Sequence, residues 1–189
     1  MKKILMSTHP IWCEKIGNKE KTEELRKIRP EIEPPFKCYI YETKGKQVEK
    51  LDGCDITYYG RGKVIGEFVC DRILEYYLPY PAFFCNVSKE VQELVKNACL
   101  TLLQAHHYIG TNPGYSFHIS ELKMYNHKEM KNISDFFKAD VLDYDTWLYG
   151  IYSGKSGARS NYNSYLNVYR LKRPPQSWCY VKELGDLIK

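Results

Sequence analysis

The sequence predicts a mixed α+β fold, because short strand patterns are scattered along the chain and only two segments carry a convincing helical pattern. The order of these patterns does not follow the regular β-α-β alternation of a parallel sheet, and it suits a mixed or barrel-like sheet. The length of 189 residues suits one domain with insertions. We therefore expect a single domain over residues 1–189.

The first half of the chain alternates predicted strands with one short helix. Residues 3–7 form an apolar run typical of a strand, and Pro10 suits the first turn of a helix that stops near Gly17. A densely charged segment follows. We expect further strands over residues 36–43 and 63–74, with the charged segment over 19–29 and a polar loop over 44–55.

The second half begins with a longer helical pattern. Ser88 is a suitable N-cap, and apolar residues recur at helical spacing to about His107. Residues 140–173 mix Tyr, Asn, Ser and Gly and give the least clear pattern of the chain, and residues 153–159 are typical of a flexible linker. The remaining expectations are a strand over 115–124, loop and short helix over 126–139, and a strand over 177–181.

Cysteine usage indicates a reduced, cytoplasmic protein. The seven cysteines are spread along the chain without a C-x-x-C pair, so they are expected to be small buried apolar residues rather than zinc ligands. The histidines show no H-x-x-x-H spacing. We expect no metal and no cofactor. The N-terminus lacks the apolar stretch of about 7–15 residues of a signal peptide, and no segment reaches the roughly 18 apolar residues of a membrane span.

Charge and aromatic content narrow the class of partner. The chain has 28 Lys and Arg against 23 Asp and Glu, a net charge of +5, which excludes an acidic disordered chain and falls short of a polycation. Its 17 tyrosines are a surplus. Tyrosine joins an apolar ring to a polar tip, so the surplus suits interfaces and surfaces on which bases stack.

Three parts of the sequence together resemble the ASCH domain of the PUA-like superfamily, in the form common in Firmicutes and their phages. The resemblance covers residues 2–74 and 174–184 well and 115–139 moderately. The usual pattern has a glycine where this chain has Lys19, so we expect a different turn there. The segments that carry the resemblance are Ile4-Leu5-Met6-Ser7 with His9-Pro10 and Lys21 to Lys27, residues 35–41 with 62–68, and Arg173 to Val181.

The resemblance implies a PUA-like small mixed β-barrel with flanking helices. It also implies a cleft lined by the Lys-Thr-x-x-x-Arg turn, with RNA or a modified nucleoside as ligand. Against such a core, the excess length lies in a helical insertion near residues 76–113 and a Tyr-rich insertion near 140–173.

The charged turn and one strand glutamate are the candidate chemical groups. In a strand, Glu24 and Arg26 share a face, and an arginine and a carboxylate beside Lys21 can bind a phosphate or a base edge. Glu67 interrupts an apolar strand, so it needs a partner such as Lys21 if it points inward, or else it lies on the outward face. A solvated charged turn is the alternative.

A wider set of residues in or beside the matching segments is expected to contact the ligand. Trp12 and Trp178 are equally well explained as packing residues. The expected ligand-binding residues are Ser7, His9, Trp12, Lys21, Thr22, Arg26, Lys27, Tyr39, His118 and Trp178.

Three functions follow as hypotheses. The first is binding of RNA or a nucleotide in a basic cleft formed by Lys21 and Arg26 with Glu24 and Glu67. The second is catalysis by Lys21, Glu24 and Glu67, because some ASCH proteins are amidohydrolases on acetylcytidine and others are proposed ribonucleases. The amidohydrolase pattern has a threonine nucleophile where this chain has Glu24, and a carboxylate cannot replace an activated hydroxyl. The third is an accessory protein that binds a protein partner through residues 140–173.

Overall fold

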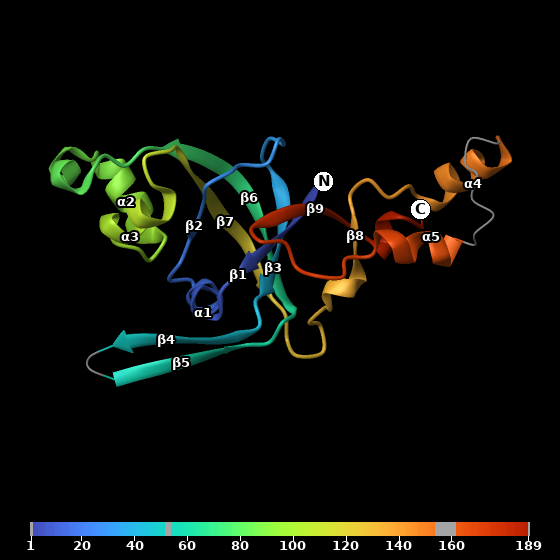
Figure 1. The fold of residues 1–189 in the computed structure, drawn as a ribbon, viewed down its shortest axis with the longest axis horizontal. Helices are drawn as coiled ribbons and strands as arrows, with labels where there is room; N and C mark the ends of the chain where they lie inside the picture. Colours follow the sequence, from blue (N-terminus) through green and yellow to red (C-terminus); the bar gives the residue numbers. More distant parts are fainter. Residues whose placement is uncertain (1, 52–53, 154–161, 189) are drawn as a thin grey trace.

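The computed structural model describes residues 2–51, 54–153 and 162–188. It is a mixed α+β fold around a seven-stranded sheet of order β2-β7-β6-β3-β1-β9-β8, with β4 and β5 forming a separate hairpin that projects from it (Figure 1). The strands are β1 (Lys3–Thr8), β2 (Glu23–Arg26), β3 (Phe36–Glu42), β4 (Gly45–Leu51), β5 (Cys54–Gly60), β6 (Val64–Tyr76), β7 (Gly114–Met124), β8 (Phe136–Lys138) and β9 (Trp178–Glu183).

Helices cover the ends of the sheet. Figure 1 shows α2 and α3 at one end of the molecule and α4 and α5 at the other. The α-helices are α1 (Pro10–Gly17), α2 (Lys89–Asn97), α3 (Leu102–Ile109), α4 (Tyr144–Tyr152) and α5 (Tyr162–Tyr169), and the 3-10 helices are η1 (Pro81–Asn86), η2 (Ile133–Asp135) and η3 (Leu184–Asp186).

The sheet is open, which corrects the expected β-barrel. Its edge strands β2 and β8 pair with β7 and β9 and not with each other. Each edge is instead covered by helices: Leu25 of β2 packs in one apolar cluster with α2 and α3, and Phe137 of β8 packs in another with Leu166 of α5. Covering an edge with a helix removes the need to close the sheet.

Alternation along the central strands builds two cores. Ile4 and Met6 of β1 pack with Cys13 and Ile16 of α1 on one face. Leu5 between them points to the opposite face, where Tyr39, Phe136 and Val181 form a second cluster. The period of two in a strand produces this division. The strands expected over 3–7, 36–43, 63–74, 115–124 and 177–181 and the helix from Pro10 to Gly17 are confirmed.

Several element predictions are wrong. The expected helix from Ser88 to His107 is two helices, because Cys99 adopts a φ of 58° and Thr101 caps a new start. The loop expected over 44–55 falls mostly in the β4–β5 hairpin, whose largely exposed strands provide no apolar alternation to detect. Within 126–139 the expected short helix is the 3-10 turn η2, followed by strand β8.

The described part of residues 140–173 contains the helices α4 and α5, in a segment that the sequence left without assigned elements. Most of the predicted linker 153–159 lies outside the described residues. Cys13, Cys38 and Cys70 are buried as expected, Cys99 and Cys179 are partly buried, and Cys54 and Cys85 are exposed, which is contrary to the expectation. No helix in the described ranges has the length and apolarity needed to span a membrane.

Candidate functional site

A cavity of about 390 Å³ lies where the end of β1, the start of α1, strand β2 and helix α3 meet. This volume is within the range of small-ligand pockets. We call it the charged pocket. Its lining residues are Ser7, Thr8, His9, Trp12, Lys21, Glu24, Leu25, Arg26, Leu100, Gln104, Tyr108 and Gln176.

Three buried charged side chains in the charged pocket form one linked group. Arg26 Nη2 lies 2.9 Å from Glu24 Oε1, and Lys21 Nζ lies 3.4 Å from Glu24 Oε2. Strand β2 supplies Glu24 and Arg26 at alternate positions, which brings them to the same face as the sequence predicts. The side chains are only 4–9% exposed, so the solvated charged turn is excluded for these three residues.

Backbone geometry holds Lys21 in place. Its ammonium donates to the carbonyl oxygens of Glu23 and Ala98, at 2.9 Å each, in addition to its ion pair with Glu24. Lys19, just upstream, has a φ of 63°, a left-handed conformation that glycine adopts more easily than other residues.

Arg26 ties the charged pocket to the C-terminal part of the chain. Its guanidinium donates to the carbonyl oxygen of Ser7 at 3.0 Å and to that of Ser177 at 3.3 Å. Ser7 in turn donates its hydroxyl to the carbonyl oxygen of Pro175 at 2.6 Å. Ends of the chain that are remote in sequence therefore meet at one guanidinium.

Two polar atoms of the linked group are left without a hydrogen bond. Glu24 Oε2 and Arg26 Nε are buried and have no hydrogen-bond partner among the described residues, although Glu24 Oε2 has the ion pair with Lys21. A buried polar atom without a partner costs about 1–3 kcal/mol. Because the Glu24 and Arg26 side chains line the cavity, these incomplete hydrogen bonds favour a ligand that carries both a donor and an acceptor.

Aromatic rings line the same cavity. Trp12 is partly exposed, with Lys15 Nζ and Lys21 Nζ each 5.5 Å from its ring centroid. Tyr108 of α3 is 37% exposed, and burial raises its pKa. Lys27 Nζ lies 5.2 Å from the Tyr108 ring, which places Lys27 at the rim. These rings provide apolar surface beside the charged group.

Glu67 does not join this site. It faces the second core, where its carboxylate accepts from Lys37 Nζ at 2.8 Å and from the Tyr125 hydroxyl. The expected partner Lys21 is therefore replaced by Lys37, because alternation along β6 places Glu67 on the same face as Tyr39, its cross-strand neighbour in β3. Although burial opposes ionisation, the hydrogen bonds from Lys37 and Tyr125 lower the pKa of Glu67.

Other predicted ligand-binding residues also lie outside the pocket. Tyr39 is 1% exposed and donates its hydroxyl to Glu183 at 2.5 Å. Trp178 donates its indole N–H to the Ile28 carbonyl at 3.0 Å and packs against Tyr180. His118 pairs with Asp71 at 2.7 Å, and Thr22 does not line the cavity. The structure therefore brings together Ser7, His9, Trp12, Lys21, Glu24 and Arg26, with Lys27 at the rim.

Sequence reasoning missed half of the lining. Thr8 is adjacent to predicted residues, but Leu100, Gln104, Tyr108 and Gln176 come from segments that only the fold brings close. Helix α3 belongs to the segment interpreted as an insertion. No local pattern in that segment signals contact with β2.

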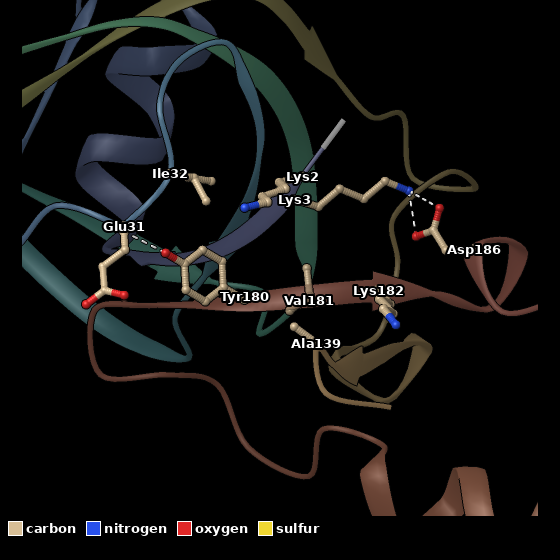
Figure 2. A pocket seen from close by; sticks show the side chains of 9 residues that line it. All are labelled: Lys2, Lys3, Glu31, Ile32, Ala139, Tyr180, Val181, Lys182 and Asp186. Carbon is tan, nitrogen blue, oxygen red and sulfur yellow. Dashed lines mark hydrogen bonds and ion pairs between the residues drawn. The ribbon is translucent and has the colours of Figure 1, made fainter. Parts of the chain in front are cut away.

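A second cavity, of about 630 Å³, lies beside β1 and β9 (Figure 2). Its polar groups are largely paired already. The Lys3 ammonium donates to the Asp186 carboxylate at 2.7 Å, and the Tyr180 hydroxyl accepts from the Glu31 backbone N–H, also at 2.7 Å. Figure 2 shows both contacts. Lys182 donates to the carbonyl oxygen of Val141. This cavity therefore offers a ligand fewer unsatisfied groups than the charged pocket.

The Tyr-rich segment packs largely on itself. Tyr144, Trp147, Tyr162 and Tyr165 form a chain of ring contacts between α4 and α5. Tyr149 and Tyr152, in contrast, are 68% and 85% exposed. The described residues contain no group of three or more His, Cys, Asp or Glu side chains placed to hold a metal ion.

Solved structures share this architecture. A mutant of the ASCH protein from Zymomonas mobilis aligns over 98% of this chain and 94% of its own, with a TM-score of 0.55 at 16% identity. The ASCH protein from Zymomonas mobilis aligns over 96% of this chain and 88% of its own, with a TM-score of 0.53 at 17% identity. The chain has the ASCH fold.

A second mutant of the Zymomonas mobilis protein aligns with a TM-score of 0.55 at 16% identity, over 98% of this chain and 92% of its own. No protein-family model matches the sequence, and the search of curated proteins finds no match. The likeness therefore concerns the ASCH fold, which the alignments cover almost from end to end.

Proposed function

We propose that this protein binds RNA or a nucleotide by receiving a base in the charged pocket. The observation that carries the proposal is the buried Glu24–Arg26 pair, whose Oε2 and Nε atoms lack hydrogen-bond partners among the described residues. A carboxylate accepts from an exocyclic amine, and an arginine N–H donates to a ring carbonyl. A base carries both kinds of group, so it supplies the kinds of partner that these two side chains lack.

The surroundings of the pair favour the same ligand. Lys21 and Arg26 outnumber Glu24 in the linked group, so its net charge is positive and suits an anionic ligand. Trp12 and Tyr108 add ring surface beside it. Stacking of one base on an aromatic side chain contributes about 1–3 kcal/mol.

The geometry favours binding over the hydrolase mechanism that pairs Lys21 with Glu67. Lys21 uses its N–H groups on two carbonyl oxygens and Glu24, while Glu67 is held by Lys37. The Ser7 hydroxyl already donates to the Pro175 carbonyl oxygen. The hydroxyl of Ser7 and the ammonium of Lys21 are therefore not free to act as the nucleophile and the base that acyl transfer requires.

The test compares the removal of a carboxylate inside the charged pocket with the removal of one outside it. Glu24→Gln removes the charge in the charged pocket, and Glu67→Gln removes a paired carboxylate outside it. We expect wild-type protein to bind labelled single-stranded RNA with an affinity that falls as salt rises. Glu24→Gln is expected to weaken binding roughly tenfold, the effect of one charge-assisted hydrogen bond, whereas Glu67→Gln is expected to bind like wild type.

Fluorescence anisotropy at several salt concentrations measures the affinities, and circular dichroism checks that both variants fold. Absence of RNA and nucleotide binding by the folded wild type would contradict the proposal. Equal losses in the two variants would contradict the assignment of the pocket. Product analysis of the same samples reports any cleavage of the RNA.

A further inference from the structure

Two grooves beside the charged pocket are lined by cations and by no acidic residue. The first contains Lys138, Lys172 and Arg173, and the second contains Lys44 with the same Lys172 and Arg173. We call these four residues the basic track. All four are exposed, and none has a hydrogen bond or ion pair with a described side chain. Elsewhere the cations at the pocket and in the second core are engaged by carboxylates.

One other cation in the first groove is already engaged. Arg170 donates to the carbonyl oxygen of Ser134, and its guanidinium lies 4.9 Å from the ring centroid of Phe137. It therefore fixes the wall of the groove. The four cations of the basic track have no such contact with a described side chain, so their charge remains available to a ligand.

One stretch of chain links the basic track to the charged pocket. Residues 172–176 lie in the connection between α5 and β9 (Figure 1) and pass from the grooves, which Pro174 lines, to the pocket, which Gln176 lines. Ser7 holds this connection by its bond to Pro175, and Arg26 holds it by its bond to Ser177. At most about 3.6 Å per residue separates the two ends, so a short oligonucleotide reaches both.

We propose that the basic track binds the phosphates of a single-stranded nucleic acid whose base occupies the charged pocket. The proposal rests on the proposed function and narrows it: the ligand is an oligomer rather than a free nucleoside or nucleotide. A single strand fits because its unpaired base enters the pocket while its backbone follows the cations. An acidic peptide matches the charge of the track and has no base for the pocket.

The test separates the track from the pocket by ligand length. Affinities are measured for a mononucleotide and for single-stranded RNA of two, four and eight nucleotides, with wild type and with Lys172→Gln/Arg173→Gln. Wild type is expected to bind the longer RNA more tightly than the mononucleotide. The double variant is expected to lose about five- to tenfold in affinity for the eight-nucleotide RNA and to keep its affinity for the mononucleotide. Its salt slope is expected to fall by about 1.4, for two phosphate contacts on a single strand.

The matched control is Lys89→Gln/Lys128→Gln, which removes the same charge from exposed lysines outside both grooves. It is expected to leave the affinity for the eight-nucleotide RNA within about twofold of wild type. Equal losses of RNA affinity in the two double variants would overturn the proposal that the basic track binds phosphates, because they would reflect net charge alone. Equally tight binding of a peptide of eight glutamates would also overturn it. In both cases, binding of the mononucleotide by wild type would still support the charged pocket as a binding site. If Glu24→Gln loses affinity for the mononucleotide and Lys172→Gln/Arg173→Gln keeps it, the two sites act separately.

Discussion

Two groups of paired charges in this protein are built differently. In the charged pocket, the buried side chains of Lys21, Glu24 and Arg26 leave a carboxylate oxygen and a guanidinium N–H without hydrogen bonds to the described residues. On the opposite core, Glu183 accepts from Lys3, Lys131 and Tyr39, and no buried side-chain atom of this second group lacks a partner among the described residues. We call the second group the sheet cluster; it also includes Lys37, Glu67, Tyr125 and Asp186.

We infer that this difference distinguishes the proposed binding site from a group that only stabilises the fold. A fully hydrogen-bonded polar network rigidifies a fold, and it leaves nothing for a ligand to satisfy. An incomplete one is costly until a partner arrives. Both groups consist of similar residue types, with lysines and glutamates in each, so completeness of pairing is the property that distinguishes them.

The largest effect is expected on removal of Lys21. Lys21→Met leaves the carbonyl oxygens of Glu23 and Ala98 and the Glu24 carboxylate without their cation. Breaking one partner out of a buried ion pair costs about 3–5 kcal/mol, so the free energy of unfolding is expected to fall by that amount. Denaturation in urea measures it. The double variant Lys21→Met/Glu24→Leu is expected to recover part of this loss of stability. Strictly additive losses in the two single variants and the double variant would contradict an energetic coupling between Lys21 and Glu24.

An intermediate effect is expected in acid, from the sheet cluster. Burial opposes ionisation of Glu183, yet hydrogen bonds from Lys131, Tyr39 and Lys3 lower its pKa to about 2, from 4.5. The unfolded chain therefore takes up this proton at higher pH than the folded chain. The stabilisation is complete above about pH 4.5 and is lost as the pH falls towards 2.

Glu183→Gln is expected to remove about 2 kcal/mol of this pH-dependent stability, after allowance for the 25% exposure of the side chain. Unfolding curves between pH 2 and pH 7 measure the difference. Glu90→Gln, on the exposed face of α2, is the control for loss of one carboxylate. If the pH dependence of the unfolding free energy were the same in Glu183→Gln and wild type, the sheet cluster would not stabilise the fold in this way.

A smaller effect separates two tyrosine hydroxyls. Tyr39→Phe removes the donor to Glu183 in the sheet cluster and is expected to cost about 1.5 kcal/mol of unfolding free energy, without changing RNA affinity. Tyr108→Phe, in the charged pocket, is expected to change stability by less than about 0.5 kcal/mol. Thermal unfolding and RNA binding of both variants check this. If Tyr39→Phe lost RNA affinity and Tyr108→Phe did not, RNA binding would belong to the sheet cluster and not to the charged pocket.

The smallest effect concerns the turn that leads to Lys21. Lys19 has a φ of 63°, a conformation that glycine adopts more easily. Lys19→Gly is therefore expected to raise the free energy of unfolding by about 1 kcal/mol and to leave RNA affinity unchanged. Urea denaturation measures the gain. A loss of stability would mean that Lys19 makes a contribution other than its backbone conformation.

Local patterns predicted much of this molecule. The apolar run in β1, the β-forming residues of β3, and Pro10 at the start of α1 were sufficient to predict those elements, because each signal lies within a few residues. The β4–β5 hairpin was missed because its strands are largely exposed and carry no apolar alternation. The break between α2 and α3 was missed because Cys99 is not a residue that usually takes a positive φ.

The sequence by itself determined the mixed fold class, the shared face of Glu24 and Arg26, and the resemblance to ASCH domains, whose fold the structure shares. Only the tertiary structure decided that the sheet stays open and that Glu67 pairs with Lys37 instead of Lys21. It also brought Tyr108 and Gln176 to the charged pocket. The physical reason is that charge pairing in a core depends on which faces of remote strands and helices meet, and a local pattern specifies a face without specifying its partner.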